Sequence, residues 1–534
     1  MVAASLVPGT SAFAMSSLPH DSTPRIHLRG LQVCALTYAP MPRWPRLAWV
    51  ARCDARTGFA TVMHGPGVET RDACFCEAIW AGDFASGDFD RTDLVLGSGG
   101  RVRAGRIVFV SSGTTVDRLH SLATHDGWLV SNSLPALVAV SGARVDAAYR
   151  RYYADFRSVV DGLRAYEPFL ATSAGDVRLT YFSNLAWNGR DLVEVPKPNA
   201  SRRFRDFAQY RGFLGDALDA LARNMRDPAR TTTFAPLGTL STGYDSPAVA
   251  VLARGIGLEE VLTFRRARGD EGDDGTPIAE RLGLRTVPAD RDAWRGLSHA
   301  AAPFLAVNAY GEEVHYASLA RVLAGRVLFT GYHGDKAWAK DAPDLSPNIV
   351  RGDPTGLSLS EFRLRAGFIH CPVPFLGVRA IADLHRISRS REMAPWDVPG
   401  DYSRPICRRI VEEAGVPRPL FGMAKRAASV VLWNRDEGFL PPEALARYET
   451  WLREHRAAWH GERTVTPFAR RARDRVVSAA LRPVRELLPL ADGYRGLDGI
   501  AQRLRRIDPA GRPDPLFDHL FPWALDEARE AYTT

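Results

Sequence analysis

The chain has 534 residues, of which 46% are hydrophobic and 24% charged; this excludes a disordered or collagen-like protein, and at roughly 100–200 residues per domain it predicts two to four domains. Six cysteines are too few for a disulfide scaffold, and no apolar run approaches the ~20 residues of a membrane span, so we expect a cytoplasmic protein. Lysine and arginine total 69 against 61 acids, a net charge of +8. Binding of a nucleic acid or of an anionic substrate would explain this charge, but we favour the base composition of the source genome as the explanation and do not expect a nucleic-acid partner.

The first part of the chain reads as strands. Residues 1–26 carry no periodic pattern and are predicted to be a disordered extension. Short β-branched and aromatic runs then recur between Gly, Asp and Ser residues, with a helical pattern at 147–163. These strand-like runs lie at 31–38, 47–51, 58–63, 94–96, 106–111, 127–130 and 177–181. We therefore predict an α+β layer domain over 27–195.

From about residue 200 strands and helices alternate, which is typical of a parallel α/β sheet. Strands are expected at 231–240, 261–264, 285–287 and 326–330, and helices at 207–222, 247–254, 276–282 and 313–323. This pattern predicts a second domain over 196–440. Residues 441–534 are predicted to form an arginine-rich helical region, in which 451–510 hold 13 arginines and 7 acids.

The most informative segment is Leu240-Ser-Thr-Gly-Tyr-Asp-Ser-Pro247, where an apolar strand enters a small-residue loop and then a helix. Pro247 suits a first helical position and Ser246 an N-cap. Free backbone N–H groups and hydroxyls at such a helix start favour an anion, and Asp245 would suit a magnesium ion beside phosphates. An ordinary strand-turn-helix explains this segment equally well when it is taken alone.

The loop resembles the S-G-G-x-D-S pyrophosphate-binding loop of the ATP pyrophosphatases, and among them the asparagine synthetase and β-lactam synthetase family. Further matching segments follow in the family's order along about 200 residues. They are Thr263-Phe264, Ile278-Ala-Glu-Arg-Leu-Gly-Leu284, Thr330-Gly-Tyr-His-Gly-Asp335, Pro374-Phe-Leu376 and Phe421-Gly-Met-Ala-Lys425. An ordered series of this kind is far more specific than the first loop alone.

The resemblance implies an N-terminal glutaminase-like sandwich followed by a Rossmann-like ATP pyrophosphatase domain. It also implies cleavage of ATP to AMP and pyrophosphate, with capture of a substrate carboxylate as an acyl-adenylate that an amine attacks. The ATP-binding residues would be Leu240, Ser241, Thr242, Gly243, Asp245, Ser246, Thr263, Gly331 and Gly334. Asp245 and Asp335 would share Mg²⁺, and Lys425 would neutralise charge on the leaving pyrophosphate.

Two further catalytic residues are predicted from the family. In β-lactam synthetase a tyrosine of this G-Y-G-x-D loop works with a glutamate some thirty residues later, which corresponds to Tyr332 and makes Glu361 the candidate partner. The structural alternative for Glu361 is a helix-surface acid, and for Lys425 a solvated lysine. Only four lysines occur in the chain, which makes the position of Lys425 more notable.

The chain also departs from the family pattern. Thr242 stands at a glycine position, Lys336 at a common glutamate and Gly377 at a common aspartate. The family's glutaminase members begin with a catalytic cysteine, whereas Met1 is here followed by Val2, and Cys34 is better explained as a small buried residue of a strand. We therefore predict that the first domain lacks glutaminase activity.

Three functions fit this sequence. The first is an AMP-forming, ATP-dependent carbon–nitrogen ligase that takes a small carboxylate and an amine. The second is a tRNA-modifying enzyme that shares the loop, although no RNA-binding module is recognisable and the later motifs favour the first. The third is a catalytically weakened relative that serves as a scaffold, for which Thr242 and Lys336 argue. The substrates, the role of the arginine-rich region and the oligomeric state, a homodimer included, stay open.

Overall fold

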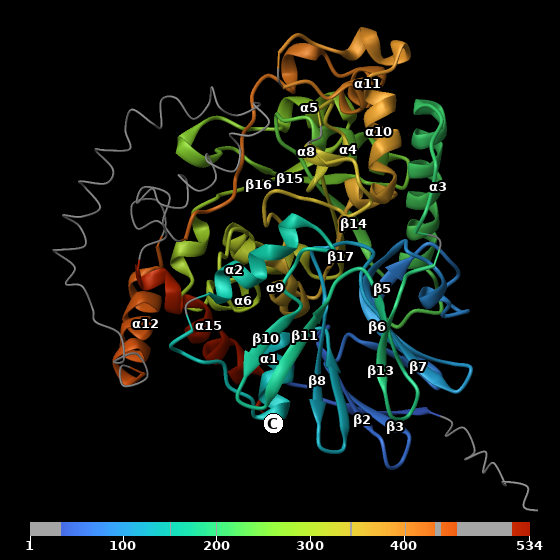
Figure 1. Cartoon of the computed structure of the whole chain (residues 1–534). Helices are drawn as coiled ribbons and strands as arrows, with labels where there is room; N and C mark the ends of the chain where they lie inside the picture. Colours follow the sequence, from blue (N-terminus) through green and yellow to red (C-terminus); the bar gives the residue numbers. More distant parts are fainter. Residues whose placement is uncertain are drawn as a thin grey trace, which may run out of the picture.

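The computed structural model describes residues 34–149, 151–198, 200–341, 344–400, 402–432, 439–455 and 515–533. The predicted extension at 1–26 and the arginine-rich stretch at 456–514 lie outside the described residues. Within this part of the chain the fold is a mixture of α and β structure with three sheets. Two of them are largely antiparallel and come from the first 195 residues, and the third is parallel and follows them (Figure 1).

The first sheet has seven strands and the second has six. The order of the first is β1 (Ala35–Pro40), β3 (Phe59–His64), β2 (Trp49–Asp54), β9 (Gly127–Ser131), β8 (Leu119–Thr124), β11 (Gly175–Thr180) and β10 (Phe169–Thr172). The order of the second is β13 (Leu192–Val195), β12 (Asn184–Trp187), β7 (Arg106–Val110), β6 (Val95–Arg103), β5 (Cys74–Trp80) and β4 (Glu69–Arg71). Among the described strands of these two sheets, β1 and β3 are the only neighbours that pair in parallel.

The two sheets pack face to face over a common apolar core, which makes a sandwich. Trp49 of the first sheet stacks on Phe109 of the second at 6.1 Å and meets Phe75 edge-on at 5.0 Å. Cys34 lies buried in the same core, and its Sγ is 3.8 Å from the carbonyl oxygen of Trp187. Its predicted place as a small buried residue is therefore confirmed, although it precedes β1.

The third sheet is entirely parallel. Its order is β16 (Arg285–Ala289), β15 (Glu260–Phe264), β14 (Ala235–Thr239), β17 (Arg326–Thr330) and β18 (Ile369–Pro372). The central strands are buried apolar runs, as a sheet covered on both faces requires. The helices of this half are α3 (Phe207–Met225), α4 (Asp245–Arg254), α5 (Thr276–Leu282), α6 (Ala302–Asn308), α7 (Ala320–Leu323), α8 (Gly334–Ala337), α9 (Leu359–Ala366), α10 (Ile381–Ser388) and α11 (Pro405–Glu413).

The last described helices return to the first half of the chain. They are α12 (Pro442–Glu454) and α15 (Leu520–Arg529), and α15 packs against α6 and against α1 (Leu134–Ser141) of the sandwich half (Figure 1). In the part of the chain that the structure describes, no helix is long and apolar enough to cross a membrane.

Two predicted helices are shorter than their sequence patterns. The pattern at 147–163 gives only α2 (Tyr152–Arg157) and one 3₁₀ turn, because Gly162 leaves the helical region at a φ of 102°. The pattern at 313–323 gives a 3₁₀ helix, Val314–Leu319, before the short α7. Val314, His315, Tyr316 and Ser318 have only weak helix propensity, although the segment has apolar residues at helical spacing.

Candidate active site

A cavity of about 230 Å³ opens at the carboxyl ends of β14, β15 and β17, where ligands bind in open parallel sheets. Its walls include Leu240, Ser241, Gly243, Asp245 and Ser246 of the first loop. Gly331 and Tyr332 come from the loop after β17, Asp335 from the short helix α8, and Lys425 from the late loop. The structure thus brings together segments that are separated by about 200 residues in the sequence.

The loop after β14 is closed by its own serines. The backbone N–H of Ser241 donates to Ser246 Oγ at 3.0 Å, and the two hydroxyl oxygens are 2.8 Å apart. Gly243 N–H points to Ser241 Oγ at 3.3 Å. These hydroxyls and the first N–H groups of α4 line one side of the cavity, an arrangement that suits an anion.

The predicted helix start is wrong by two residues. Helix α4 begins at Asp245, its N-cap is Tyr244, and Ser246 turns its hydroxyl back to Ser241 instead of capping. Tyr244 is buried and accepts a hydrogen bond from Arg408, which fixes the chain before Asp245. Pro247 is tolerated because it still falls in the first turn, where backbone N–H groups lack partners in the helix.

Thr242 fits its position for a reason that the sequence did not indicate. Its N–H and its hydroxyl both donate to Asp273 Oδ1, at 2.9 and 2.7 Å. Thr242 has no positive φ, so the loop does not need the freedom of a glycine there. Asp273 is buried, which raises the pKa of its carboxyl group.

The two predicted metal-binding carboxylates lie near each other because glycines allow the loops to meet. A Cβ atom on Gly331 would lie 2.5 Å from Asp245 Cβ, and one on Gly334 would lie 2.5 Å from Asp245 Cγ. Burial raises the pKa of Asp245, and the negative charge of Asp335 adds to the rise. The adjacent Arg404 opposes it through an ion pair with Asp245.

Two lysines approach Asp335. Lys425 Nζ is 3.6 Å from its Oδ2, and Lys336 Nζ is 3.5 Å from the same atom. The Lys425 side chain is 67% exposed at the cavity wall, so both the catalytic role and the solvated alternative remain compatible with its place. Lys336, where the resembled family commonly has a glutamate, makes the charge beside Asp335 more positive, which favours binding of anions.

The site was also tested for its fit to Mg²⁺. Among the described residues no group of three or more His, Cys, Asp or Glu side chains could hold a metal ion by itself. Mg²⁺ in nucleotide sites is held by one or two carboxylates together with phosphate oxygens. Asp245 and Asp335, both on the cavity wall, supply such a pair, so the residues fit Mg²⁺ that arrives with a polyphosphate.

The structure does not bring Glu361 to Tyr332. Glu361 is buried on α9, where Ser133 Oγ donates to it at 2.7 Å and Tyr532 OH at 2.6 Å. It is therefore neither the predicted partner nor a helix-surface acid. Tyr332 OH instead donates to Tyr316 OH at 3.3 Å. Sequence separation could not predict this, because α9 turns Glu361 towards α1 and the chain end.

Tyr332 is a neutral phenol in this environment. Burial raises its pKa well above the usual value, and the nearby Tyr316 and Glu313 raise it further. Glu313 is itself buried, and it accepts hydrogen bonds from Gly356 N–H at 2.7 Å and from the backbone and hydroxyl of Ser358. Tyr332 lines the cavity as a neutral phenol whose single O–H is donated to Tyr316, so its oxygen can accept a hydrogen bond there.

The two histidines near the motifs are also uncharged. Burial lowers the pKa of His333 and of His370 to about 3. His333 stacks on Phe375 at 4.6 Å and adopts a φ of 71°, a left-handed conformation that few non-glycine residues adopt. His370 shares a hydrogen bond of 2.9 Å with Thr330.

Thr263 and Gly377, two further positions named from the sequence, have structural contacts of their own. Thr263 Oγ1 accepts a hydrogen bond of 2.8 Å from Gly275 N–H, beside the first loop. Gly377, the departure from the family's aspartate, has a φ of 75°, and a Cβ atom there would lie 2.9 Å from the Phe213 ring. No motif indicated three residues that line the cavity: Asp273, Tyr316 and Arg404.

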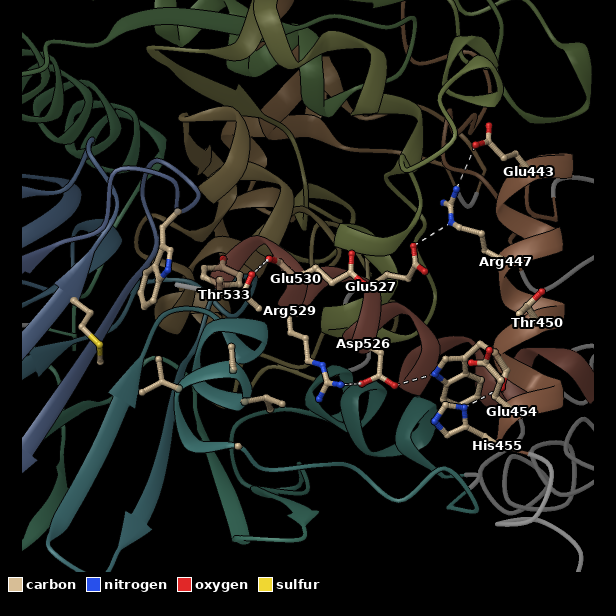
Figure 2. Close-up of a pocket in the computed structure, with 18 of the residues that line it drawn as sticks. Glu443, Arg447, Thr450, Glu454, His455, Asp526, Glu527, Arg529, Glu530 and Thr533 are labelled. Carbon is tan, nitrogen blue, oxygen red and sulfur yellow. Dashed lines mark hydrogen bonds and ion pairs between the residues drawn. The ribbon is translucent and has the colours of Figure 1, made fainter.

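A larger groove lies elsewhere, between α12, α15 and the sandwich, with a volume of about 1190 Å³ (Figure 2). It contains none of the predicted site residues. Several of its charged groups pair with one another: Arg447 lies 3.2 Å from Glu527 and 3.7 Å from Glu443, and Arg529 lies 3.3 Å from Asp526. Figure 2 shows these pairs along the groove wall, which favours a structural role for them.

Comparison with known proteins does not place the chain in a family. No family model matches it, and no curated protein does. Among solved structures it is similar to the predicted subunit of a tRNA methyltransferase from Methanocaldococcus jannaschii DSM, at 18% identity over 36% of this chain and 95% of that chain. The TM-score of that likeness is 0.17, which is too low to indicate a shared fold.

Proposed function

We propose that the protein is an AMP-forming, ATP- and Mg²⁺-dependent synthetase that joins a small carboxylate to an amine. The observation that carries the proposal is the joint placement of Ser241, Asp245, Asp335 and Lys425 around one cavity at the carboxyl edge of the parallel sheet. Hydroxyls and backbone N–H groups suit phosphate oxygens, and paired carboxylates beside them suit a divalent ion. The resemblance of the surrounding motifs to the asparagine synthetase family agrees with this assignment.

In the first step a carboxylate oxygen of the substrate attacks the α-phosphorus of ATP, and the bond to pyrophosphate breaks. Ser241, Ser246 and the start of α4 would hold the leaving pyrophosphate, and Lys425 would neutralise the charge that develops on it. Mg²⁺, when bound by Asp245 and Asp335, would offset the charge of the phosphate oxygens. The products of this step are an acyl-adenylate and pyrophosphate.

In the second step the amine attacks the acyl carbon, the bond between that carbon and the AMP oxygen breaks, and the amine passes a proton to the departing phosphate of AMP. Tyr332 and Tyr316 line the cavity and would orient the amine by hydrogen bonding. Because the pKa of Tyr332 is raised, its neutral phenol does not by itself act as the base. Glu361 has no part in this step, since it is enclosed by Ser133 and Tyr532.

Pyrophosphate release tests the proposal. The full-length protein, with Mg²⁺ and ATP, is mixed with pools of small carboxylic acids and amino acids, or with tRNA. Release that depends on a small acid supports the synthetase, release only with tRNA would replace it by tRNA modification, and no release together with no ATP binding by calorimetry would favour a scaffold. Asp245→Ala should abolish release, a loss of at least about 10³-fold, without loss of the fold.

A further inference from the structure

Arg404 holds the carboxylate that the proposed reaction needs for its metal. Its guanidinium lies immediately before α11 and forms an ion pair with Asp245 Oδ2. The other oxygen, Oδ1, faces the Cys407 thiol at 3.6 Å. Both carboxylate oxygens of Asp245 therefore already have a partner within the protein. A divalent ion cannot take the Oδ2 position while Arg404 stays there.

The Arg404 side chain is placed to change partner. It lines the cavity in which a polyphosphate would lie, although only 8% of the side chain is exposed. The rings of Tyr402 and Tyr244 flank the guanidinium carbon at 5.4 and 5.9 Å, which supports a cation in that place without fixing its hydrogen bonds. A guanidinium binds phosphate oxygens in the same two-pronged manner in which it binds a carboxylate.

We propose that Arg404 is the resident counter-ion of Asp245, and that it gives up this carboxylate when Mg²⁺·ATP binds and pairs with the polyphosphate instead. The inference rests on the proposed function, since it assigns the metal and the nucleotide to this cavity. It makes Arg404 a binding residue for the nucleotide, and it explains why an arginine is buried against the loop's acid. It also means that the metal alone binds poorly.

Two binding measurements test this with Mn²⁺ as the probe at pH 8. Free Mn²⁺ is counted by electron paramagnetic resonance in a titration of the protein without nucleotide, and Mn²⁺·ATP binding is measured by calorimetry. In Arg404→Met the affinity for Mn²⁺ alone should rise about tenfold, because a buried carboxylate that loses its partner gains more from a new cation. The affinity for Mn²⁺·ATP should fall about tenfold, because one phosphate contact is lost.

Opposite shifts separate this role from a structural one, which would weaken both affinities together. Arg404→Lys keeps the charge with fewer donors and should show the same two shifts at smaller size, which also covers a failure of the Met variant to fold. Arg409→Met is the matched control, because Arg409 lies on α11 and also packs over two aromatic rings, but it pairs with Glu392 and Glu413 outside the cavity. It should leave both affinities within about twofold of the wild type.

Unchanged or weaker binding of Mn²⁺ alone in both Arg404 variants would overturn the inference. So would Mn²⁺·ATP binding as tight as in the wild type. The proposed function can fail separately from this inference. In that case the wild type would release no pyrophosphate, while the Arg404 variants would still shift metal and nucleotide affinity in opposite directions. The protein would then bind the nucleotide for another purpose. If the wild type releases pyrophosphate but the Arg404 variants bind Mn²⁺ and Mn²⁺·ATP as the wild type does, the synthetase proposal holds and only the role of Arg404 is refuted.

Discussion

Two arginine–carboxylate clusters of the molecule are built alike and differ in what surrounds them. In the first, Arg363 of α9 bridges the sandwich to the parallel-sheet half: it donates to Glu77 at 2.6 Å and to both oxygens of Asp117 at 3.0 Å. Ser98 and Asn132 donate to the same Glu77. In the second, Arg404 meets Asp245 at the wall of the cavity.

The difference is access for a ligand. Every acid of the Arg363 cluster is enclosed by protein donors, so that cluster holds two halves of the fold together and cannot exchange partners. The Arg404 cluster opens onto the cavity, where Asp335 and Lys425 add two further charges. Their ion pair is long, with 3.6 Å between Lys425 Nζ and Asp335 Oδ2. Burial by itself therefore does not mark a functional charge, and the proposed role of Arg404 depends on its place at the wall of the cavity that the first loop lines.

The largest effect on stability is expected from the enclosed cluster. Arg363→Met leaves Glu77 and Asp117 buried without a counter-charge, which should lower the free energy of unfolding by about 3–5 kcal/mol in urea titration. Arg285→Met is the control, since that side chain is 69% exposed beside Glu260, and it should cost less than about 1 kcal/mol. Similar losses for both variants would show that enclosure does not separate the clusters.

A smaller, pH-dependent effect on the free energy of unfolding is expected when Glu312, near the cavity, is replaced by glutamine. Burial raises its pKa to about 8, and the charges of Glu313 and Asp353 add to this, while Arg157 and Arg268 oppose it. The folded protein keeps a proton that the unfolded chain releases near pH 4.5, so stability falls as the pH rises from about 4.5 to 8. Glu312→Gln removes this loss.

The free energies of unfolding of wild type and Glu312→Gln should therefore diverge with pH. The variant should gain on the order of 2 kcal/mol over the wild type between pH 5.5 and 8.5 in urea titrations. Glu194→Gln, on an edge strand beside Arg178, serves as the comparison and should show no such gain. A constant gap for Glu312→Gln would mean that its carboxyl group ionises normally in the folded state.

Hydrophobic periodicity and glycine-containing loops in the sequence correctly predicted several strands, helices and loops of the parallel-sheet half. The β17 strand and the α5 helix lie where the periodicity placed them, at 326–330 and 276–282. The cavity loops were found because glycines and small polar residues directly follow buried strands. Gly331 and Gly334 illustrate the physical reason, since each lies where a side chain would strike Asp245.

Contacts between distant segments could not be predicted in this way. Arg404 reaches Asp245 across 159 residues, and Asp273 reaches Thr242 across 31, and neither sits in a recognisable motif. Glu361 shows the converse error, because a plausible spacing to Tyr332 said nothing of the direction in which α9 faces. The start of α4 was misplaced because Ser246 has a better partner, Ser241, than the backbone it was expected to cap.

A smaller change in the free energy of unfolding is expected where the two loops meet, at Gly334→Ala. The new Cβ atom would lie 2.6 Å from Asp245 Oδ1 and push that carboxylate, while φ at this position suits any residue. The cost to the free energy of unfolding should be about 1–2 kcal/mol in urea titration, the range of an overpacked site. Pyrophosphate release should fall far more than this cost suggests, because the displaced group belongs to the cavity.

The matched change is Gly212→Ala on the exposed face of α3, where a Cβ atom meets nothing within 4 Å. There an alanine should stabilise the protein by about 0.5–1 kcal/mol, since it restricts the unfolded chain, and leave pyrophosphate release unchanged. If Gly334→Ala instead kept full release, the close contact between the loops would serve only packing. The open cluster would then differ from the enclosed one in exposure but not in function.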